Sequence, residues 1–272
     1  MMKKAILLIL AIAAMIAPST AVPVSIDAYG EIMRRQIIRI GVSKDYPPLN
    51  FNAGERGVEM DMARRLADFL GVKLELIPLD VGDYTTAIVD RRVDIVIGGF
   101  SRNLSRARRI WFSEPYLAVT PGVLVTLRSI PRTRLGDTFE EPPIRTVWDL
   151  AQIPGIKIAV KKGSVYEHLL ESEFPSMPRV SVPTNEEGLE LLKKGSVNGF
   201  IHDSLYLDHI FHTTPGARSS YVFLQGGGLL EQICIGLPFG DQVLKTQVDT
   251  FIREIIRLGL IDKWLKEHSE ER

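Results

Sequence analysis

The sequence is poor in cysteine, since Cys234 is the only one in 272 residues. A single thiol excludes an internal disulfide and a zinc site built from several thiolates. Because Cys234 lies in the apolar run Gln232–Gly236, we predict a small buried residue rather than a nucleophile. No cysteine stands directly after the amino-terminal apolar segment, so we expect no lipid anchor.

Net charge is missing as well, because 33 Lys and Arg residues balance 33 Asp and Glu residues. The chain has no basic tract, and we expect neither nucleic acid nor anionic lipid as a partner. It lacks a glycine-rich phosphate loop and a Gly-x-Ser-x-Gly motif, and we expect no cofactor. His209 and His212 are one helical turn apart without a third ligand nearby, which favours a solvated helix face over a metal site.

Long hydrophobic runs are scarce too. The longest, Ala5–Ala17, has about 13 residues, whereas a helix needs roughly 20 to span a bilayer. Lys3 and Lys4 precede it, and small residues flank a cut after Ala21, which is typical of a secretory signal peptide. We therefore predict a signal peptide over 1–21 and a periplasmic protein. An uncleaved single-pass anchor is the alternative.

What the rest of the chain does contain is an alternation of short strands and helices. The first run has a strand at Ile37–Val42, a helix that ends at Gly71, a strand at Val72–Pro78, a helical stretch at Asp83–Arg92 and a strand at Val93–Ile97. The second run has a helical turn at Val147–Ala151, strands at Ile156–Val160, Val180–Val182 and Val197–Ile201, and helices at Ser164–Glu171 and Asn185–Lys194. This order predicts an α/β fold with sheets covered by helices.

Two α/β lobes explain the repeated order better than one. The end of the chain has a strand around Cys234 followed by helices, so we expect it to return to the first lobe. The predicted parts are 36–120 with 231–272 for lobe one, 121–230 for lobe two, crossings at Tyr116–Thr120 and Leu230–Gln232, and a surface excursion at Arg128–Pro143. Two such lobes enclose a cleft at strand ends, where open α/β sheets place ligands.

Several stretches of the sequence resemble one family. They are Gly57–Ala63, Asp94–Ser101, Arg106, Phe112–Tyr116, Val160–Ser164 and Leu258–Trp264. In this order and spacing they resemble the periplasmic amino-acid-binding proteins of ABC transporters, solute-binding protein family 3, over nearly the whole mature chain. The resemblance implies a type II periplasmic-binding-protein fold whose two lobes close around an amino acid. It also implies a monomer that meets the membrane permease subunits of an ABC transporter.

The resemblance implies a set of ligand-binding residues. An α-amino acid presents a carboxylate and an ammonium, so a selective pocket needs a guanidinium or amide donors for one and an acid for the other. By resemblance, Arg106 and Ser101 bind the carboxylate, and the Gly99 carbonyl accepts from the ammonium. Taken alone, Arg106 belongs to a cluster of arginines over 102–109, which a solvated face would equally explain.

The second lobe is expected to supply further contacts. Ser164 and Val165 would present backbone amides of a helix N-terminus to the carboxylate, and Asp203 would receive the ammonium. His202 would touch the ligand side chain, while Tyr46 of the first lobe would support the ligand's carbon skeleton. Ordinary helix caps at Ser164 and Asp203 are the alternative interpretation.

The chain departs from the family pattern at four positions. Ser43 stands where many relatives have an aspartate that reaches the ligand side chain, and Val81 where many have a second aromatic residue. Val58 and Glu59 replace the usual aromatic residue and aspartate. Because a buried cation without an acid partner is costly, the change at Ser43 favours a ligand with a polar or neutral side chain.

Two other functions stay open. Gly99–Tyr116 is also similar to the cyclohexadienyl (arogenate) dehydratases of the same fold, which need a general acid to protonate the departing hydroxyl. Their glutamate falls at Tyr206 here, and a tyrosine, with an ordinary pKa of about 10, is a poor acid for that step. We therefore expect a binding protein rather than an enzyme. A stand-alone periplasmic ligand sensor is the third candidate.

Overall fold

The computed structural model describes residues 27–130, 133–135, 138–140, 144–227 and 229–270. The predicted signal peptide at 1–21 lies outside these residues. Within them, no helix combines the length and the apolar character that crossing a membrane requires. Two five-stranded sheets and one two-stranded hairpin organise the described chain.

The first lobe is built on a sheet in the order β2-β1-β3-β12-β4. Its strands are β1 (Ile37–Ser43), β2 (Lys73–Leu79), β3 (Ile95–Ile97), β4 (Trp111–Val119) and β12 (Glu231–Leu237). β1 is parallel to β2 and β3, whereas β12 runs antiparallel between β3 and β4. A strand from near the end of the chain therefore lies inside the sheet that the first strands begin.

Helices cover both faces of this sheet. The helices of this lobe are α2 (Ala28–Arg35), α3 (Val58–Leu70), α4 (Tyr84–Val89) after the 3-10 turn η2 (Val81–Asp83), α5 (Leu104–Ala107), α11 (Gln242–Arg257) and α12 (Leu260–Glu270). Of these, α5 buries no residue, and α12 packs on α3 and α11. α2, α3 and α11 share one buried apolar layer that includes Ile32, Leu66 and Ile252. α4 packs against β3 and β12 in a second layer around Cys234. The prediction that Cys234 is buried is thereby confirmed.

The second lobe contains the sheet β11-β5-β10-β8-β9. Its strands are β5 (Pro121–Thr126), β8 (Ile158–Lys161), β9 (Arg179–Val182), β10 (Gly199–Asp203) and β11 (Tyr221–Gln225). Its helices are α6 (Val147–Leu150), α7 (Val165–Glu173), α8 (Asn185–Lys194), α9 (Ser204–Thr213) and α10 (Ala217–Ser220). β8 is parallel to β9 and β10, and β5 is antiparallel to β10 and β11.

The described part of the excursion Arg128–Pro143 contains short elements. The 3-10 turn η3 (Leu127–Ser129) leads into it, and β6 (Thr133–Leu135) pairs with β7 (Thr138–Glu140) as an antiparallel hairpin. This hairpin forms a two-stranded sheet that is separate from the second lobe's main sheet.

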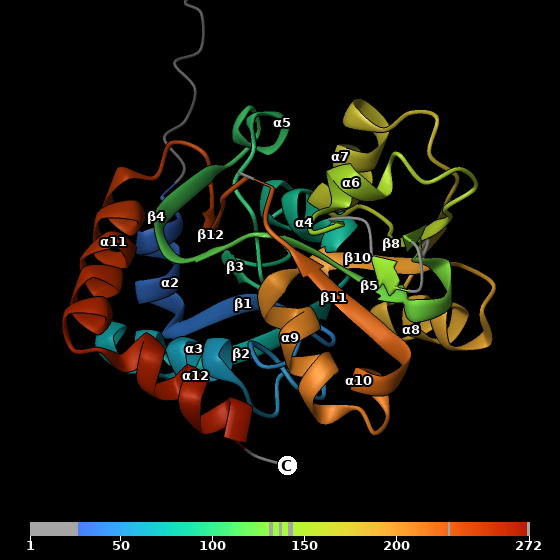
Figure 1. Ribbon diagram of the computed structural model, residues 1–272. Helices are drawn as coiled ribbons and strands as arrows, with labels where there is room; N and C mark the ends of the chain where they lie inside the picture. Colours follow the sequence, from blue (N-terminus) through green and yellow to red (C-terminus); the bar gives the residue numbers. More distant parts are fainter. Residues whose placement is uncertain (1–26, 131–132, 136–137, 141–143, 228, 271–272) are drawn as a thin grey trace, which may run out of the picture.

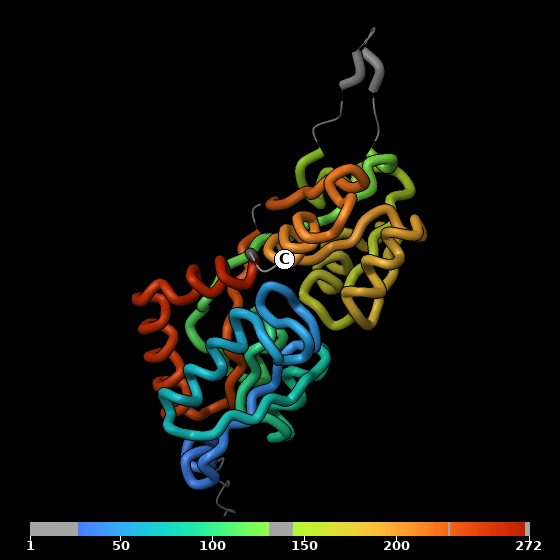
Figure 2. Tube along the Cα trace, turned by 90° about the horizontal axis from the view of Figure 1, so that it is seen from below, coloured from blue at the N-terminus to red at the C-terminus, as the bar shows by residue number. Residues whose placement is uncertain are grey.

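Two segments connect the lobes (Figure 1). β4 passes into β5 at Thr120, and the chain after β11 leads back to β12. Figure 2 shows two bodies that form one elongated molecule, with the C-terminal helices on the first lobe. Two sheets flanked by helices confirm the predicted two-lobed α/β fold.

Candidate functional site

One cavity between the lobes is lined by all eight residues that the sequence singled out. They are Tyr46, Gly99, Ser101 and Arg106 of the first lobe and Ser164, Val165, His202 and Asp203 of the second. Ser43, Val81, Tyr84, Gly98, Lys161 and Tyr166 complete the lining. As the lobes lie in the structure, the cavity encloses about 30 Å³, which is close to the share of one water molecule in the liquid.

The fold brings these residues together because they stand at the ends of neighbouring strands. Gly99 and Ser101 follow β3, Lys161 ends β8 and Asp203 ends β10. β8 and β10 are parallel neighbours, so their carboxyl ends meet at the same edge of the second sheet. The N-terminus of α7, at Val165, opens at that edge. The cavity is therefore the meeting point of two sheet edges.

Arg106 spans the two lobes. Its backbone amide is capped by the Asn103 side chain at the start of α5. Its guanidinium donates to the Ser101 carbonyl at 2.7 Å and, across the cleft, to the Gly163 carbonyl at 3.2 Å. Burial lowers the pKa of Arg106 to about 10, so the group remains charged at neutral pH. A fixed cation is thus present in the cavity, and not on a solvated face.

Ser101 has a partner that the sequence did not identify. Its hydroxyl donates to Glu231 Oε2 at 2.9 Å, and its backbone bridges to Ile233 of β12. Burial raises the pKa of Glu231 to about 7, against the lowering effect of the Tyr166 and Ser101 hydroxyls. Glu231 falls within the predicted crossing Leu230–Gln232, which was the one available signal that it lies near the cleft.

Asp203 is the cavity's anion. It is almost fully buried at the start of α9, where its Oδ1 accepts from the Tyr206 amide at 2.8 Å. Its Oδ2 lies 2.6 Å from His202 Nδ1 and accepts from the Tyr46 hydroxyl. Burial raises the pKa of Asp203. The attraction of His202 and these hydrogen bonds outweigh burial and hold the pKa below its usual range. Asp203 is therefore both the predicted cap of a helix and an ionised group on the cavity wall.

Aromatic rings cluster beside Asp203. The Tyr46 ring lies against Gly99 so closely that a Cβ at that position would be 1.9 Å from its Cε1, and only glycine fits there. Tyr46 also meets His202 edge to face, with ring centroids 5.0 Å apart, and His202 lies 4.3 Å from Tyr206. Tyr46 thus lines the cavity from the first lobe while its hydroxyl reaches the opposite lobe.

The second lobe's helix α7 supplies the last wall. The Ser164 hydroxyl accepts from the Glu167 amide at 3.2 Å, so it is a helix cap as the simpler interpretation held. Gly163 donates its amide to Glu167 Oε2 at 2.7 Å. Lys161, which the sequence interpretation did not single out, lines the cavity nearby. Burial lowers the pKa of Lys161, against the raising effect of Asp80 and Asp45.

The four positions that depart from the family pattern divide into two pairs. Ser43 and Val81 line the cavity. Val58 and Glu59 are fully buried at the start of α3, where Glu59 accepts from the Gly99 amide. Ser43 and Val81 can therefore contact a ligand in the cavity. Glu59 instead supports the Gly99 peptide, which we call the floor of the cavity.

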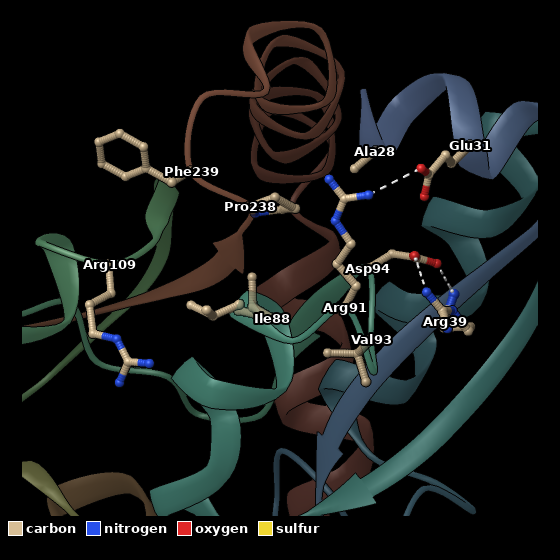
Figure 3. Close-up of a pocket in the computed structure, with 11 residues that line it drawn as sticks. Ala28, Glu31, Arg39, Ile88, Arg91, Val93, Asp94, Arg109, Pro238 and Phe239 are labelled. Carbon is tan, nitrogen blue, oxygen red and sulfur yellow. Dashed lines mark hydrogen bonds and ion pairs between the residues drawn. The ribbon is translucent and has the colours of Figure 1, made fainter. Parts of the chain in front are cut away.

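A second hollow, of about 110 Å³, lies on the first lobe away from the cleft (Figure 3). Four of its charged side chains form two ion pairs, since Arg39 lies 3.0 Å from Asp94 and Arg91 lies 3.2 Å from Glu31. The first pair links β1 to the start of β3, and the second joins α2 to the turn after α4. We therefore interpret the hollow as structural.

The part of the chain that the structure describes contains no cluster of three His, Cys, Asp or Glu side chains that would hold a metal. His212 is exposed on α9 with Nδ1 3.3 Å from Asp208. His209 packs its ring 5.7 Å from that of Phe51.

Comparison with known proteins decides the family. A model of bacterial extracellular solute-binding proteins, family 3, matches residues 38–271. The chain belongs to this family. The resemblance that the sequence motifs indicated is thereby confirmed.

Individual members of the family differ in what they do. A membrane-bound lytic murein transglycosylase F of Idiomarina loihiensis is 33% identical over 250 residues, which are 89% of this chain and 51% of that protein. A cyclohexadienyl dehydratase of Pseudomonas aeruginosa is 28% identical over 89% of this chain and 85% of its own length. The chain thus spans about half of the first relative and most of the second.

Solved structures agree on the fold. An amino acid ABC transporter substrate-binding protein, AbpA of Streptococcus pneumoniae, bound to L-arginine, superposes with a TM-score of 0.76 at 21% identity. The match covers 89% of this chain and 98% of that one. At this identity the likeness shows the shared two-lobed fold of the family.

The raised pKa of Glu231 gives the stability of this family member a pH dependence. In the unfolded chain the carboxyl loses its proton near its ordinary pKa of 4.5, whereas in the folded protein it keeps the proton up to about 7. The folded state therefore loses stability as pH rises from about 4.5 to about 7. Glu231→Gln cannot ionise at this position. We expect its free energy of unfolding to rise relative to that of wild type by on the order of 2 kcal/mol as the pH increases over this range. Denaturant unfolding at pH 5 and pH 8 measures the difference, and a gap that is the same at both pH values would contradict it.

Proposed function

We propose that the chain is an extracytoplasmic solute-binding protein that captures an amino acid with a polar or neutral side chain between its lobes for uptake by an ABC transporter. The observation that carries the proposal is the pair Arg106 and Asp203, a cation and an anion on one buried cavity. A zwitterionic ligand matches such a pair, because each end meets the opposite charge. Membership of the solute-binding family supports it.

In the structure, Arg106 and Asp203 each form a hydrogen bond with a protein group that a ligand would replace. The Gly163 carbonyl accepts from Arg106, and a ligand carboxylate is a stronger acceptor for the same fork. The Tyr46 hydroxyl donates to Asp203, and a ligand ammonium is a stronger donor. The Val165 amide would complete the carboxylate site together with the Ser164 amide, which now donates to the Lys161 carbonyl at 3.2 Å. Ser101 would turn its hydroxyl from Glu231 to the same carboxylate, and the Gly99 carbonyl would accept from the ammonium.

Admission of a ligand requires the lobes to separate. A cavity of about 30 Å³ holds a water but no amino acid, and the Tyr46 hydroxyl joins its two walls by donating to Asp203. We propose that the lobes, 36–120 with 231–272 and 121–230, open about the crossings at Tyr116–Thr120 and Leu230–Gln232. A ligand that contacts both lobes shifts the population toward the closed form, which the membrane permease subunits would recognise. The predicted signal peptide and a periplasmic location belong to this proposal, as does a monomeric state.

Arg106→Ala tests the carboxylate site. A panel of amino acids in a thermal-shift assay first identifies those that bind, and calorimetry then measures their affinity for each variant. We expect Arg106→Ala to weaken binding about 10- to 150-fold, which corresponds to the loss of a charged hydrogen bond. Arg108→Ala, a neighbouring exposed arginine at the end of α5, is the matched control and should bind as wild type. Equal affinity of the Arg106 variant and wild type would refute the assignment.

Lys161 indicates which side chain the cavity prefers. It and Arg106 give the lining two cations against the one low-pKa carboxylate of Asp203. A zwitterion neutralises one charge of each sign, and the Lys161 ammonium, which Asp80 and Asp45 attract from outside the lining, is left to be satisfied inside the cavity. A side-chain amide or carboxyl oxygen would do so, whereas an apolar side chain would leave a half-buried cation without a partner from the ligand. An oxygen-bearing side chain is therefore favoured.

Comparison of L-glutamine with L-norleucine measures this preference. We expect wild type to bind glutamine more tightly, and Lys161→Met to narrow the ratio of the two affinities about tenfold, mainly by weakening glutamine. Lys162→Met changes the exposed neighbour and should keep the wild-type ratio. If both variants keep that ratio, Lys161 has no role in side-chain selection.

A second candidate is dehydration of a cyclohexadienyl acid, as in the relative from Pseudomonas aeruginosa. Burial raises the pKa of Tyr206 well above its ordinary value, so this residue is a poor acid. Glu231, in contrast, keeps its proton to about pH 7 beside Ser101, and could protonate a hydroxyl that leaves as water. Incubation of the protein with prephenate or arogenate tests this candidate. Turnover that disappears in Glu231→Gln would establish it in place of transport, and we expect no turnover in either protein.

A further inference from the structure

Glu59 is a buried carboxyl that the proposed ligand contacts do not use. It is the second residue of α3, and its side chain is fully buried. Its Oε1 accepts two hydrogen bonds, one from the Gly99 amide at 2.6 Å and one from the Tyr116 hydroxyl. Its Oε2 is buried and has no hydrogen-bond partner among the residues that the structure describes. One oxygen atom thus holds together two segments that are separate in sequence.

These two segments have different places in the molecule. Gly99 lies on the cavity wall beneath the Tyr46 ring, with φ at 60°. Tyr116 lies in β4, shortly before this strand crosses to the second lobe at Thr120. The Glu59 carboxyl therefore stands between the floor of the cavity and the strand that connects the lobes.

A carboxyl is an expensive side chain for this position. Burial raises the pKa of Glu59 to about 7, against the lowering effect of its two hydrogen bonds. Asp203 from β10, Tyr46 from the loop after β1 and Tyr84 from α4 are the other ionisable groups that act on it or feel its charge. An apolar residue of similar volume would avoid the cost of burial. Unlike an apolar residue, a carboxyl can accept hydrogen bonds from the Gly99 amide and the Tyr116 hydroxyl at the same time.

We propose that Glu59 is a positioning residue that fixes the Gly99 peptide in the cavity and links it, through Tyr116, to the crossing strand. That the cavity binds a ligand rests on the proposed function, but the link between Gly99 and Tyr116 requires no ligand. A ligand group that settles against Gly99 acts on the same carboxyl that anchors β4. Occupancy of the cavity floor is thereby coupled to the strand about which the lobes open.

Two substitutions of Glu59 separate the reach of the side chain from its charge. Glu59→Gln keeps the length and an oxygen acceptor, whereas Glu59→Asp keeps the charge but is one methylene shorter. We expect the affinity for L-glutamine in calorimetry to stay within about threefold of wild type in Glu59→Gln and to fall about tenfold in Glu59→Asp. Equal affinities of the two variants, or a larger loss in Glu59→Gln, would overturn the positioning role.

Hydrogen exchange followed by NMR tests the link without a ligand. Tyr116→Phe removes one hydroxyl from β4, and we expect the Gly99 amide to exchange about tenfold faster in this variant and in Glu59→Asp, but not in Glu59→Gln. Tyr221→Phe, which removes the same atom from β11 of the second lobe, is the matched control and should leave the Gly99 rate unchanged. An unchanged rate in Tyr116→Phe would overturn the link. If wild type binds no amino acid, the proposed function fails, and the exchange rates still decide the link.

Discussion

The carboxylate of Asp203 is the group around which the two lobes are arranged. It is removed from water at the end of β10, where an ionised acid is tolerated only if hydrogen bonds and nearby charge replace its hydration. The Tyr206 amide and His202 supply part of that replacement from its own lobe, and Tyr46 supplies the rest from the other. Since Arg106 likewise donates to the opposite lobe, closure satisfies both charges. Any ligand must compete with these contacts. Its affinity is therefore the difference in free energy between its own contacts with Arg106 and Asp203 and the protein contacts that it replaces.

The fold class followed from the sequence because hydrophobic periodicity and caps act locally. α8 has the predicted bounds Asn185–Lys194, and α3 ends before Gly71, where a left-handed φ of 69° suits glycine. Periodicity did not reveal β4, whose middle carries Ser113, Glu114 and Pro115. This strand is held by pairing with β12 from far along the chain, and no local pattern encodes that partner. The predicted lobe boundaries follow the division of the strands between the sheets, but their end points stay a prediction.

The lining of the cavity was foreseen better than its chemistry. The eight chosen residues meet there, because family spacing marks strand ends, and strand ends converge at one edge. Lys161 and Glu231 were missed, since a charged residue at the end of a strand is ordinary until the tertiary fold places it beside other groups. Glu231 comes next to Ser101 only through the bridge from Ser101 to Ile233.

The position of β12 inside the first sheet has a consequence for how the chain acquires its structure. β4 pairs with β12, and β12 in turn pairs with β3, so the first sheet stays in two parts until residue 237 has been synthesised. The second sheet needs only residues 121–225, which are contiguous. Although the first lobe begins earlier in sequence, the second is the one that can form as a unit during elongation. Its strand edges and apolar faces would then be covered before those of the first lobe, which depend on contacts between distant segments.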